Sequence, residues 1–266
     1  MSRLLKLTPR AAPVSPTSAV VWHDLECGSY RADLALWHEL AAREPGPILD
    51  VGAGTGRVAL ALARAGHRVT ALDRDLQLLA ALRERAGAIP VRTVCADARD
   101  FRLPAHRFAL CIVPMHTIQL LRGPSDRSRF LRCACASLRP GGLLACALLG
   151  PVEPYASATG DPEPEPETAV LEGLLYTSRP TRVALSRAGV RIERERSVVA
   201  LSLRGGARRT PTRVTRSRER SVDELQRLSP RTFRREGAAA GLRPERDRAV
   251  APTEDHAGST VVMLRA

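Results

Sequence analysis

Residues 48–56 read Ile-Leu-Asp-Val-Gly-Ala-Gly-Thr-Gly. A short apolar run followed directly by alternating glycines predicts a buried strand that turns sharply into a helix. Because glycine has no Cβ, the backbone at Gly52, Gly54 and Gly56 can turn tightly and come close to a ligand. The glycine spacing alone is also compatible with a simple tight turn, so the flanking sequence decides between the two readings.

The flanking sequence alternates apolar runs with helical patterns. Ala- and Leu-rich segments at helical spacing occupy residues 58–65 and 76–86, and Ser125 is placed to cap a helix that runs to Leu138. Further strands are predicted from apolar runs at residues 69–72, 91–95, 108–113 and 143–149. This alternation predicts a parallel sheet with helices on both faces and right-handed crossovers.

Acidic residues accompany the ends of the first three predicted strands. Asp50 lies near the end of the first strand, Asp73 follows the second, 21 residues beyond Gly52, and Asp97 follows the third. The carboxyl ends of parallel strands meet at one edge, where open α/β sheets bind ligands. An acid at this spacing from a glycine turn can reach a ribose diol. The pattern therefore predicts a nucleotide-like cofactor at this edge.

Together with Leu-Arg-Pro-Gly-Gly at residues 138–142, these motifs resemble the ordered motif series of class I S-adenosylmethionine-dependent methyltransferases, over about residues 30–150. The resemblance implies an α/β fold that is Rossmann-like: a seven-stranded, mostly parallel sheet with helices on both faces and an antiparallel last strand, expected at residues 261–264. It also implies an enzyme that transfers a methyl group from S-adenosylmethionine to an acceptor.

The resemblance further implies which residues contact the cofactor. The glycine loop and the acid of the first strand would hold the methionine moiety, Asp73 the ribose hydroxyls and Asp97 the adenine edge. The expected cofactor-binding set is Asp50, Gly52, Ala53, Gly54, Gly56, Asp73, Arg74, Asp97, Ala98, Pro114 and Met115.

Three residues are candidates for the acceptor side of the site. His116 is the candidate base, by its position after the fourth strand and by the ordinary histidine pKa near neutrality; its alternative role is to line the pocket. Gln119 could orient an acceptor from the same loop. Tyr30 could contact the amino-acid end of the cofactor or simply pack at the sheet boundary.

The second half of the chain has a different character. Pro-Glu repeats at residues 151–168 predict a mobile acidic loop, and a helix is expected from Ser229-Pro230 through Ala240. Between them, strands are expected at residues 183–185, 190–192, 198–203 and 213–220, so we predict an antiparallel β-rich elaboration. The expected division is a lead-in (1–29), a cofactor-binding core (30–150), an acceptor-side elaboration (151–220) and a C-terminal helix and strand that complete the core sheet (221–266).

Composition bounds the choice of partner. The formal charge is +13 with a single lysine, Lys6, and the arginines concentrate between Arg179 and Arg248. Such charge attracts polyanions, yet aromatic residues make up only 3% of the chain, which disfavours base stacking. Ile-Val-Pro-Met at residues 112–115 also departs from the Asn/Asp-Pro-Pro-Tyr/Phe pattern of enzymes that methylate exocyclic or amide nitrogens. We therefore expect a small-molecule acceptor, compatible with an anionic group; nucleic acid is disfavoured as the partner but stays open.

Two alternatives stay open at this point. An NAD(P)-dependent oxidoreductase also uses glycines and an acid, but its Gly-x-Gly-x-x-Gly pattern would need glycine where Arg57 stands. The other is a basic protein on a methyltransferase fold that binds or modifies RNA. The six cysteines form no C-x-x-C pair and no apolar stretch is long enough to span a membrane, so we expect no metal site and a cytoplasmic protein.

Overall fold

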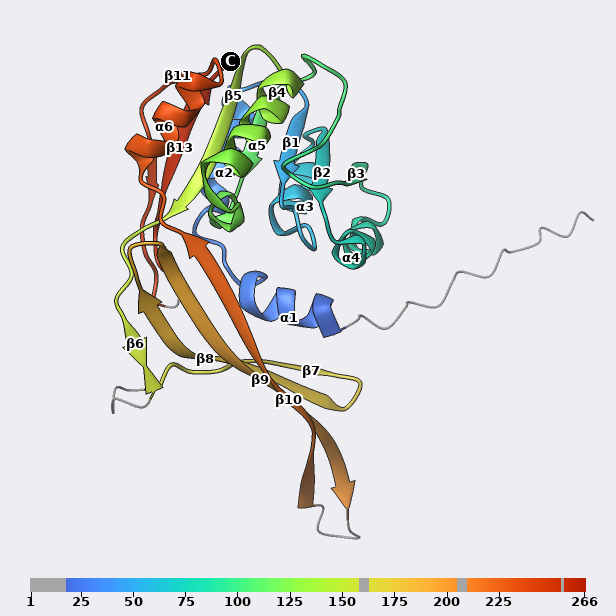
Figure 1. The fold of residues 1–266 in the computed structure, drawn as a ribbon. Coiled ribbons are helices and arrows are strands. Elements are labelled where there is room, and N and C mark those ends of the chain that lie inside the picture. The colour runs from blue at the N-terminus through green and yellow to red at the C-terminus, as the bar shows by residue number, and fades with distance from the viewer. Residues whose placement is uncertain (1–17, 158–162, 205–209, 255) are drawn as a thin grey trace, which may run out of the picture.

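The computed structural model describes residues 18–157, 163–204, 210–254 and 256–266, and it contains two β-sheets (Figure 1). A core sheet lies between helices, and a second, antiparallel sheet projects from one end of it. The predicted acidic loop lies partly outside the described residues, at 158–162. No helix among the described residues is both long and apolar enough to span a membrane.

The core sheet is built from β1 (Ile48–Val51), β2 (Val69–Asp73), β3 (Val91–Cys95), β4 (Phe108–Val113), β5 (Leu138–Leu149), β11 (Arg243–Pro244), β12 (Arg248–Val250) and β13 (Ser259–Arg265). The spatial order is β11-β13-β5-β4-β1-β2-β3, with β12 also beside β13. Strands β1 to β5 pair in parallel, whereas β13 runs antiparallel to β5. The expected Rossmann-like α/β fold with an antiparallel last strand is confirmed.

The sheet departs from the expected seven strands at one edge only. There β11 pairs with Leu264 and Arg265, while β12 pairs with residues 259–261, so two short strands share one position. Pro244 has no N–H to continue the ladder, and the charged residues 245–247 follow it. The edge strand is therefore interrupted, and the sheet counts eight strands.

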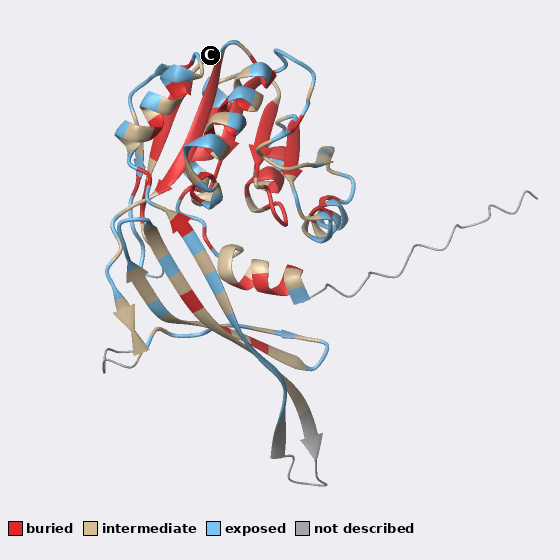
Figure 2. Cartoon of the chain, viewed as in Figure 1, coloured by how far each residue is buried: buried red, intermediate tan, exposed pale blue. Residues whose placement is uncertain are grey.

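Helices cover both faces of the core sheet, and their bounds are α2 (Leu34–Arg43), α3 (Arg57–Arg64), α4 (Leu76–Ala86), α5 (Gly123–Ser137) and α6 (Pro230–Ala239). Helices α2, α3 and α4 pack on one face and α5 and α6 on the other. Strands β1 and β4 are buried along their whole length, as Figure 2 shows in red, because side chains on both faces meet helices.

Some helix ends differ from the sequence predictions. Helix α5 starts at Gly123 with Pro124 in its first turn, so Ser125 lies inside the helix and does not cap it. A proline has the φ value that a first turn needs, which favours this earlier start. Strand β5 already begins at Leu138 and contains the Pro-Gly-Gly segment. The predicted cap of α6 is confirmed, because the Ser229 hydroxyl accepts a hydrogen bond from the Thr232 N–H at 3.1 Å.

The second sheet contains β6 (Tyr155–Ala156), β7 (Glu167–Leu171), β8 (Leu174–Leu185), β9 (Gly189–Arg204) and β10 (Thr210–Gln226), in the order β10-β9-β8-β6 with β7 beside β8. The antiparallel elaboration is confirmed, but the two strands predicted at 190–192 and 198–203 are one strand, β9. The polar residues between them continue the alternation and pair across the sheet, as Glu193 does with Arg220. Strand β10 also crosses the boundary predicted at residue 220, and the domain division stays a prediction.

A helix stands in the segment that we predicted as a lead-in. Helix α1 (Ser18–Cys27) buries Val20, Val21, Trp22 and Leu25 and lies between the core sheet and the second sheet (Figure 1). Its apolar residues pack partly against the second sheet, where the rings of Trp22 and Tyr176 meet edge to face at 5.3 Å. Residues 1–17 lie outside the described residues.

Candidate functional site

The glycine loop, residues 52–56, connects the end of β1 to the start of α3. Gly52, Gly54 and Gly56 have φ values of 74°, 54° and 93°, a region that is costly for a residue with a Cβ. Space is limited as well: a Cβ on Gly52 would overlap the Thr117 side chain, and one on Gly54 would overlap the ring of His23. Backbone conformation and close packing therefore both require glycine in this loop.

Asp50 lies on β1 directly before the loop and is buried. Its side chain is 1% exposed, and its Oδ1 atom has no hydrogen-bond partner among the described residues. Burial raises the pKa of Asp50 to about 7, with Arg57 opposing the rise and Asp73 adding to it. A buried acceptor atom without a partner indicates that a ligand or water completes the site.

Asp73 connects the end of β2 to the glycine loop. Its Oδ2 accepts a hydrogen bond from the Gly54 N–H at 2.8 Å, and its Oδ1 accepts one from the Asp75 N–H at 2.9 Å. Each oxygen keeps a second lone pair, so the carboxylate can still accept from a ligand. The structure thus brings the predicted acid into direct contact with the predicted loop. Arg74, the next residue, is exposed.

Asp97 lies at the same edge, after β3, and is held by its own neighbour. Arg99 donates to both of its carboxylate oxygens at 2.9 and 2.6 Å, and this contact lowers the pKa of Asp97 to about 2. The Ala96 N–H donates to the Asp73 carbonyl oxygen at 3.0 Å, which fixes the two strand ends side by side. Ala98 packs against the core.

The segment after β4 takes a strained path across this edge. Pro114 is buried, and Met115 and His116 have φ values of 49° and 64°. Residues other than glycine rarely take these values, and such strain is concentrated at functional sites. Burial lowers the pKa of His116 to about 4. The expectation of a pKa near neutrality is therefore wrong, and His116 is a neutral side chain and a weak base at pH 7.

Gln119, on η1 (Thr117–Leu120), has a structural role that the sequence did not suggest. Its Nε2 donates to the Gln226 carbonyl oxygen at 3.0 Å, and its Oε1 accepts from the Leu149 N–H at 2.7 Å. The side-chain amide thus connects the ends of β5 and β10, one from each sheet. Since both polar atoms already have backbone partners, the suggestion that Gln119 orients an acceptor is not favoured.

Tyr30 belongs to a cluster around Arg57, the first residue after the glycine loop. Its ring stacks on His256 with centroids 4.7 Å apart, and the Arg57 guanidinium lies 5.2 Å from the same ring. Arg57 is bound by Asp33 through two hydrogen bonds of 2.5 and 2.8 Å, and both side chains are buried. His256 comes from the segment between β12 and β13, so no sequence spacing relates it to the motifs.

Helix α1 also reaches the glycine loop. Asp24 accepts a hydrogen bond from the Thr55 hydroxyl at 2.7 Å and is paired with Arg85 of α4. The ring of His23 lies beside Gly54 and within 3.3 Å of the Thr55 hydroxyl oxygen. Sequence reasoning missed these residues, because the signal was only a short apolar run, Val20 to Trp22, in a segment taken as a lead-in.

No metal-binding group of three or more His, Cys, Asp or Glu residues occurs among the described residues.

Part of the chain matches a known protein family. Residues 48–142 match the family described as "Methyltransferase domain". Among curated proteins, the chain is 34% identical over 145 residues to a malonyl-[acyl-carrier protein] O-methyltransferase of Xylella fastidiosa, covering 53% of this chain and 46% of that protein. A ubiquinone biosynthesis O-methyltransferase of a Methylobacterium species is 34% identical over 105 residues, 38% of this chain and 40% of its own length. The matches thus span less than half of these relatives.

Solved structures match the fold over almost the whole chain. An amino pentose methyltransferase from Micromonospora echinaspora, solved with S-adenosylmethionine bound, has a TM-score of 0.65 at 19% identity and covers 97% of this chain and 100% of its own. A sugar N-methyltransferase from a Streptoalloteichus species has a TM-score of 0.62 at 19% identity, with both chains covered completely. At this identity the likeness establishes the fold.

Proposed function

We propose that this chain transfers a methyl group from S-adenosylmethionine to a small-molecule acceptor, because residues 48–142 match a methyltransferase domain and the fold is that of S-adenosylmethionine-dependent methyltransferases. The observation that carries the proposal is the unpartnered, buried oxygen of Asp50 directly before a loop where packing requires glycine. A buried acceptor and a close-approach backbone suit a ligand that brings its own hydrogen-bond donors.

Each predicted contact of the cofactor uses a feature of this edge. The Asp50 carboxylate would accept from the ammonium group of the methionine moiety, and the free lone pairs of Asp73 from the ribose hydroxyls. Asp97, ionised by its contact with Arg99, would accept from the adenine amino group. Met115 and His116 would border the transferred methyl group, since their strained backbone follows β4 at the same edge.

The reaction needs little chemistry from the protein. When bound, the cofactor supplies a methyl group that is already activated on a sulfonium. The protein then has to align the acceptor atom in line with that group and keep water away. His116, neutral because its pKa is about 4, would accept a hydrogen bond from the acceptor and orient it. In this scheme His116 is a positioning group, and strong general-base catalysis by it is not part of the proposal.

The proposed acceptor is a small molecule. The structural neighbours named above are an amino pentose methyltransferase and a sugar N-methyltransferase, and the curated relatives are O-methyltransferases. Two arginines that face α1 are already neutralised, since Arg196 pairs with Glu26 and Arg194 with Glu167. An anionic group on the acceptor is therefore not part of the proposal. The same comparisons lend no support to the oxidoreductase or RNA-binding alternatives, and a cytoplasmic location belongs to the proposal.

Calorimetric titration with S-adenosylmethionine and S-adenosylhomocysteine tests the proposal, with NAD as the control ligand. Both sulfur compounds should bind and NAD should not. Asp73→Ala should weaken binding by roughly 10- to 100-fold, the effect of losing a hydrogen bond to a charged group. Asp100→Ala is the matched control, since Asp100 is exposed and lies three residues beyond Asp97. Binding of NAD alone, or an unchanged dissociation constant in folded Asp73→Ala, would refute the assignment.

A further inference from the structure

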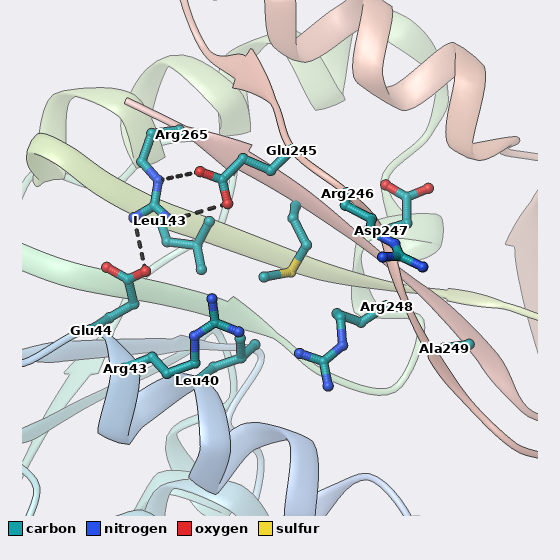
Figure 3. Close-up of a pocket in the computed structure, with 11 residues that line it drawn as sticks. Leu40, Arg43, Glu44, Leu143, Glu245, Arg246, Asp247, Arg248, Ala249 and Arg265 are labelled. Carbon is teal, nitrogen blue, oxygen red and sulfur yellow. Dashed lines mark hydrogen bonds and ion pairs between the residues drawn. The ribbon is translucent and has the colours of Figure 1, made fainter.

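A cavity of about 620 Å³ lies at the β11–β12 edge of the core sheet, on the face that α2 covers. It opens between the last turn of α2 and the interruption of the edge strand between β11 and β12 (Figure 3). Its volume is within the range of sites that hold small organic ligands. The lining strand β5 is two strand spacings from β1, roughly 10 Å, and its residue Leu143 is in register with Ile48, four residues before Gly52, so this cavity is separate from the proposed active site.

The floor of the cavity is apolar. Leu40 of α2, Leu143 of β5 and Met263 of β13 line it, and each of these residues is less than 5% exposed overall. They belong to the core cluster that α2 covers, and Arg43 and Glu44 at the end of α2 line the cavity beside them. A ligand with an apolar body can therefore rest on the floor without disturbing the core.

The rim is charged, and its carboxylates already have partners. Arg265 pairs with Glu44 at 2.9 Å and with Glu245 at 2.7 Å, while Asp247 pairs with Arg234. Just outside the lining, Glu39 accepts two hydrogen bonds of 2.7 Å from Arg248. The acids around the cavity are therefore neutralised by arginines and do not repel an anion.

Two guanidinium groups that line the cavity lack a close carboxylate partner of their own. Arg246 has no hydrogen bond or ion pair among the described residues, and Arg43 has a single exposed contact of 3.4 Å, to the Glu39 carboxylate that Arg248 already occupies. Figure 3 shows these two residues on opposite sides of the cavity, Arg43 on α2 and Arg246 in the segment between β11 and β12. Guanidinium forks match the geometry of carboxylate and phosphate oxygens, so this rim suits an anionic head group.

We propose that this cavity is a second binding site, for a small amphiphilic anion whose carboxylate or phosphate head group is held by Arg246 at the rim and whose apolar body rests on Leu40, Leu143 and Met263. The site is independent of the proposed methyl transfer. It requires only that the ligand replace solvent at the spare guanidinium groups and over an apolar floor.

Calorimetric titration of the full chain with hexyl phosphate and with hexanoate tests the site, and hexanol and inorganic phosphate are the comparison ligands. We expect saturable binding of one or both anions at one site, and weaker binding of hexanol and of inorganic phosphate by about tenfold or more. The two anions distinguish a phosphate from a carboxylate head group. Absence of saturable binding, or equal binding of hexanol or inorganic phosphate, would overturn the proposal.

Three variants locate the site. Arg246→Ala should weaken binding by about tenfold or more, whereas Arg243→Ala, which removes the same charge from an exposed position on β11 outside the lining, should leave it unchanged. Ala249→Trp should block the probe by filling the cavity from its exposed rim. Equal losses in Arg243→Ala and Arg246→Ala, or undiminished binding to Ala249→Trp, would contradict the proposal. S-adenosylmethionine binding is measured in the same samples and should stay unchanged in all three variants. A failure of the cavity proposal can then be distinguished from a failure of the proposed function.

Discussion

The two sheets of this protein are held together by different forces. In the core sheet, β1 and β4 are buried on both faces, and the charged groups near them are buried in pairs such as Arg57 with Asp33. In the second sheet most residues are partly or fully exposed, and many charges pair across strands in contact with water (Figure 2). The same kind of ion pair should therefore contribute strongly to stability in the core sheet and weakly in the second sheet.

The largest effect is expected at the buried pair beside the glycine loop. Asp33→Ala leaves the Arg57 guanidinium buried without its partner and also removes the hydrogen bond from Trp37 Nε1. Loss of one member of a buried pair costs about 3–5 kcal/mol, measurable by urea unfolding. The double variant Asp33→Leu/Arg57→Met should recover part of this loss, because no charge then stays buried. A loss below about 1 kcal/mol, the value for surface pairs, would remove the contrast between the sheets.

A similar effect with a pH dependence is expected at Asp50. Its folded-state pKa of about 7 lies above the ordinary value of 3.8, so folding favours the protonated form. The associated stability is present below pH 4 and is lost as the pH rises to about 7, a total of about 4 kcal/mol for a shift of this size. Asp50→Asn should not show this loss. The difference in unfolding free energy between variant and wild type should therefore grow in favour of the variant between pH 4 and pH 7.

The control for Asp50 is Asp100→Asn, an exposed substitution of the same chemistry that should follow the wild-type pH profile. Asp50→Asn should also bind S-adenosylmethionine more weakly, because it loses the charge that we assign to the methionine ammonium. A pH profile parallel to that of wild type would show that Asp50 ionises normally in the folded protein.

A smaller effect is expected at the junction between the sheets. Gln119→Ala leaves the Leu149 N–H and the Gln226 carbonyl without their partner, at a cost of about 1–3 kcal/mol. Thermal unfolding followed by circular dichroism measures it. Gln226→Ala is the control, because Gln226 takes part in the bridge through its backbone. Equal stability of Gln119→Ala and wild type would show that the bridge does not hold the two sheets together.

The smallest effect is expected within the second sheet. Glu195 and Arg218 approach to 3.9 Å with side chains 39% and 69% exposed. Exposed pairs of this kind contribute less than about 1 kcal/mol and are screened by salt. Glu195→Gln should therefore change the urea midpoint hardly at all and lose what effect it has in high salt. A loss as large as that of Asp33→Ala would mean that the two sheets are not distinguished by burial.

The core could be predicted from sequence because each of its elements has a local signal. Apolar runs predicted β1 to β4, and the glycines of residues 52–56 predicted the tight turn that follows β1. Three acids, Asp50, Asp73 and Asp97, were placed at one edge by the rule that parallel strands end together. In the structure Asp73 contacts the loop and lies beside the end of β3. Their contacts with the cofactor stay predictions.

The parts that sequence reasoning missed depend on contacts between distant residues. Helix α1 has a weak amphipathic pattern, and its burial comes from partners such as Tyr176 far along the chain. The length of β9 depends on cross-strand charge pairs, which interrupt an apolar pattern without ending the strand. The reduced pKa of His116 and the bridge of Gln119 both follow from burial at the sheet junction, which no single segment encodes.

Helix α1 sets the limits of what could be exchanged between relatives. One side of the helix is bound to the glycine loop through Asp24 and Thr55, and its last turn is bound to the second sheet through Glu26 and Arg196. A chimaera that took only the contiguous β-rich segment from a relative would therefore lose the contacts between that segment and α1. The smallest unit that keeps these contacts is therefore a discontinuous one, residues 18–27 together with the second sheet.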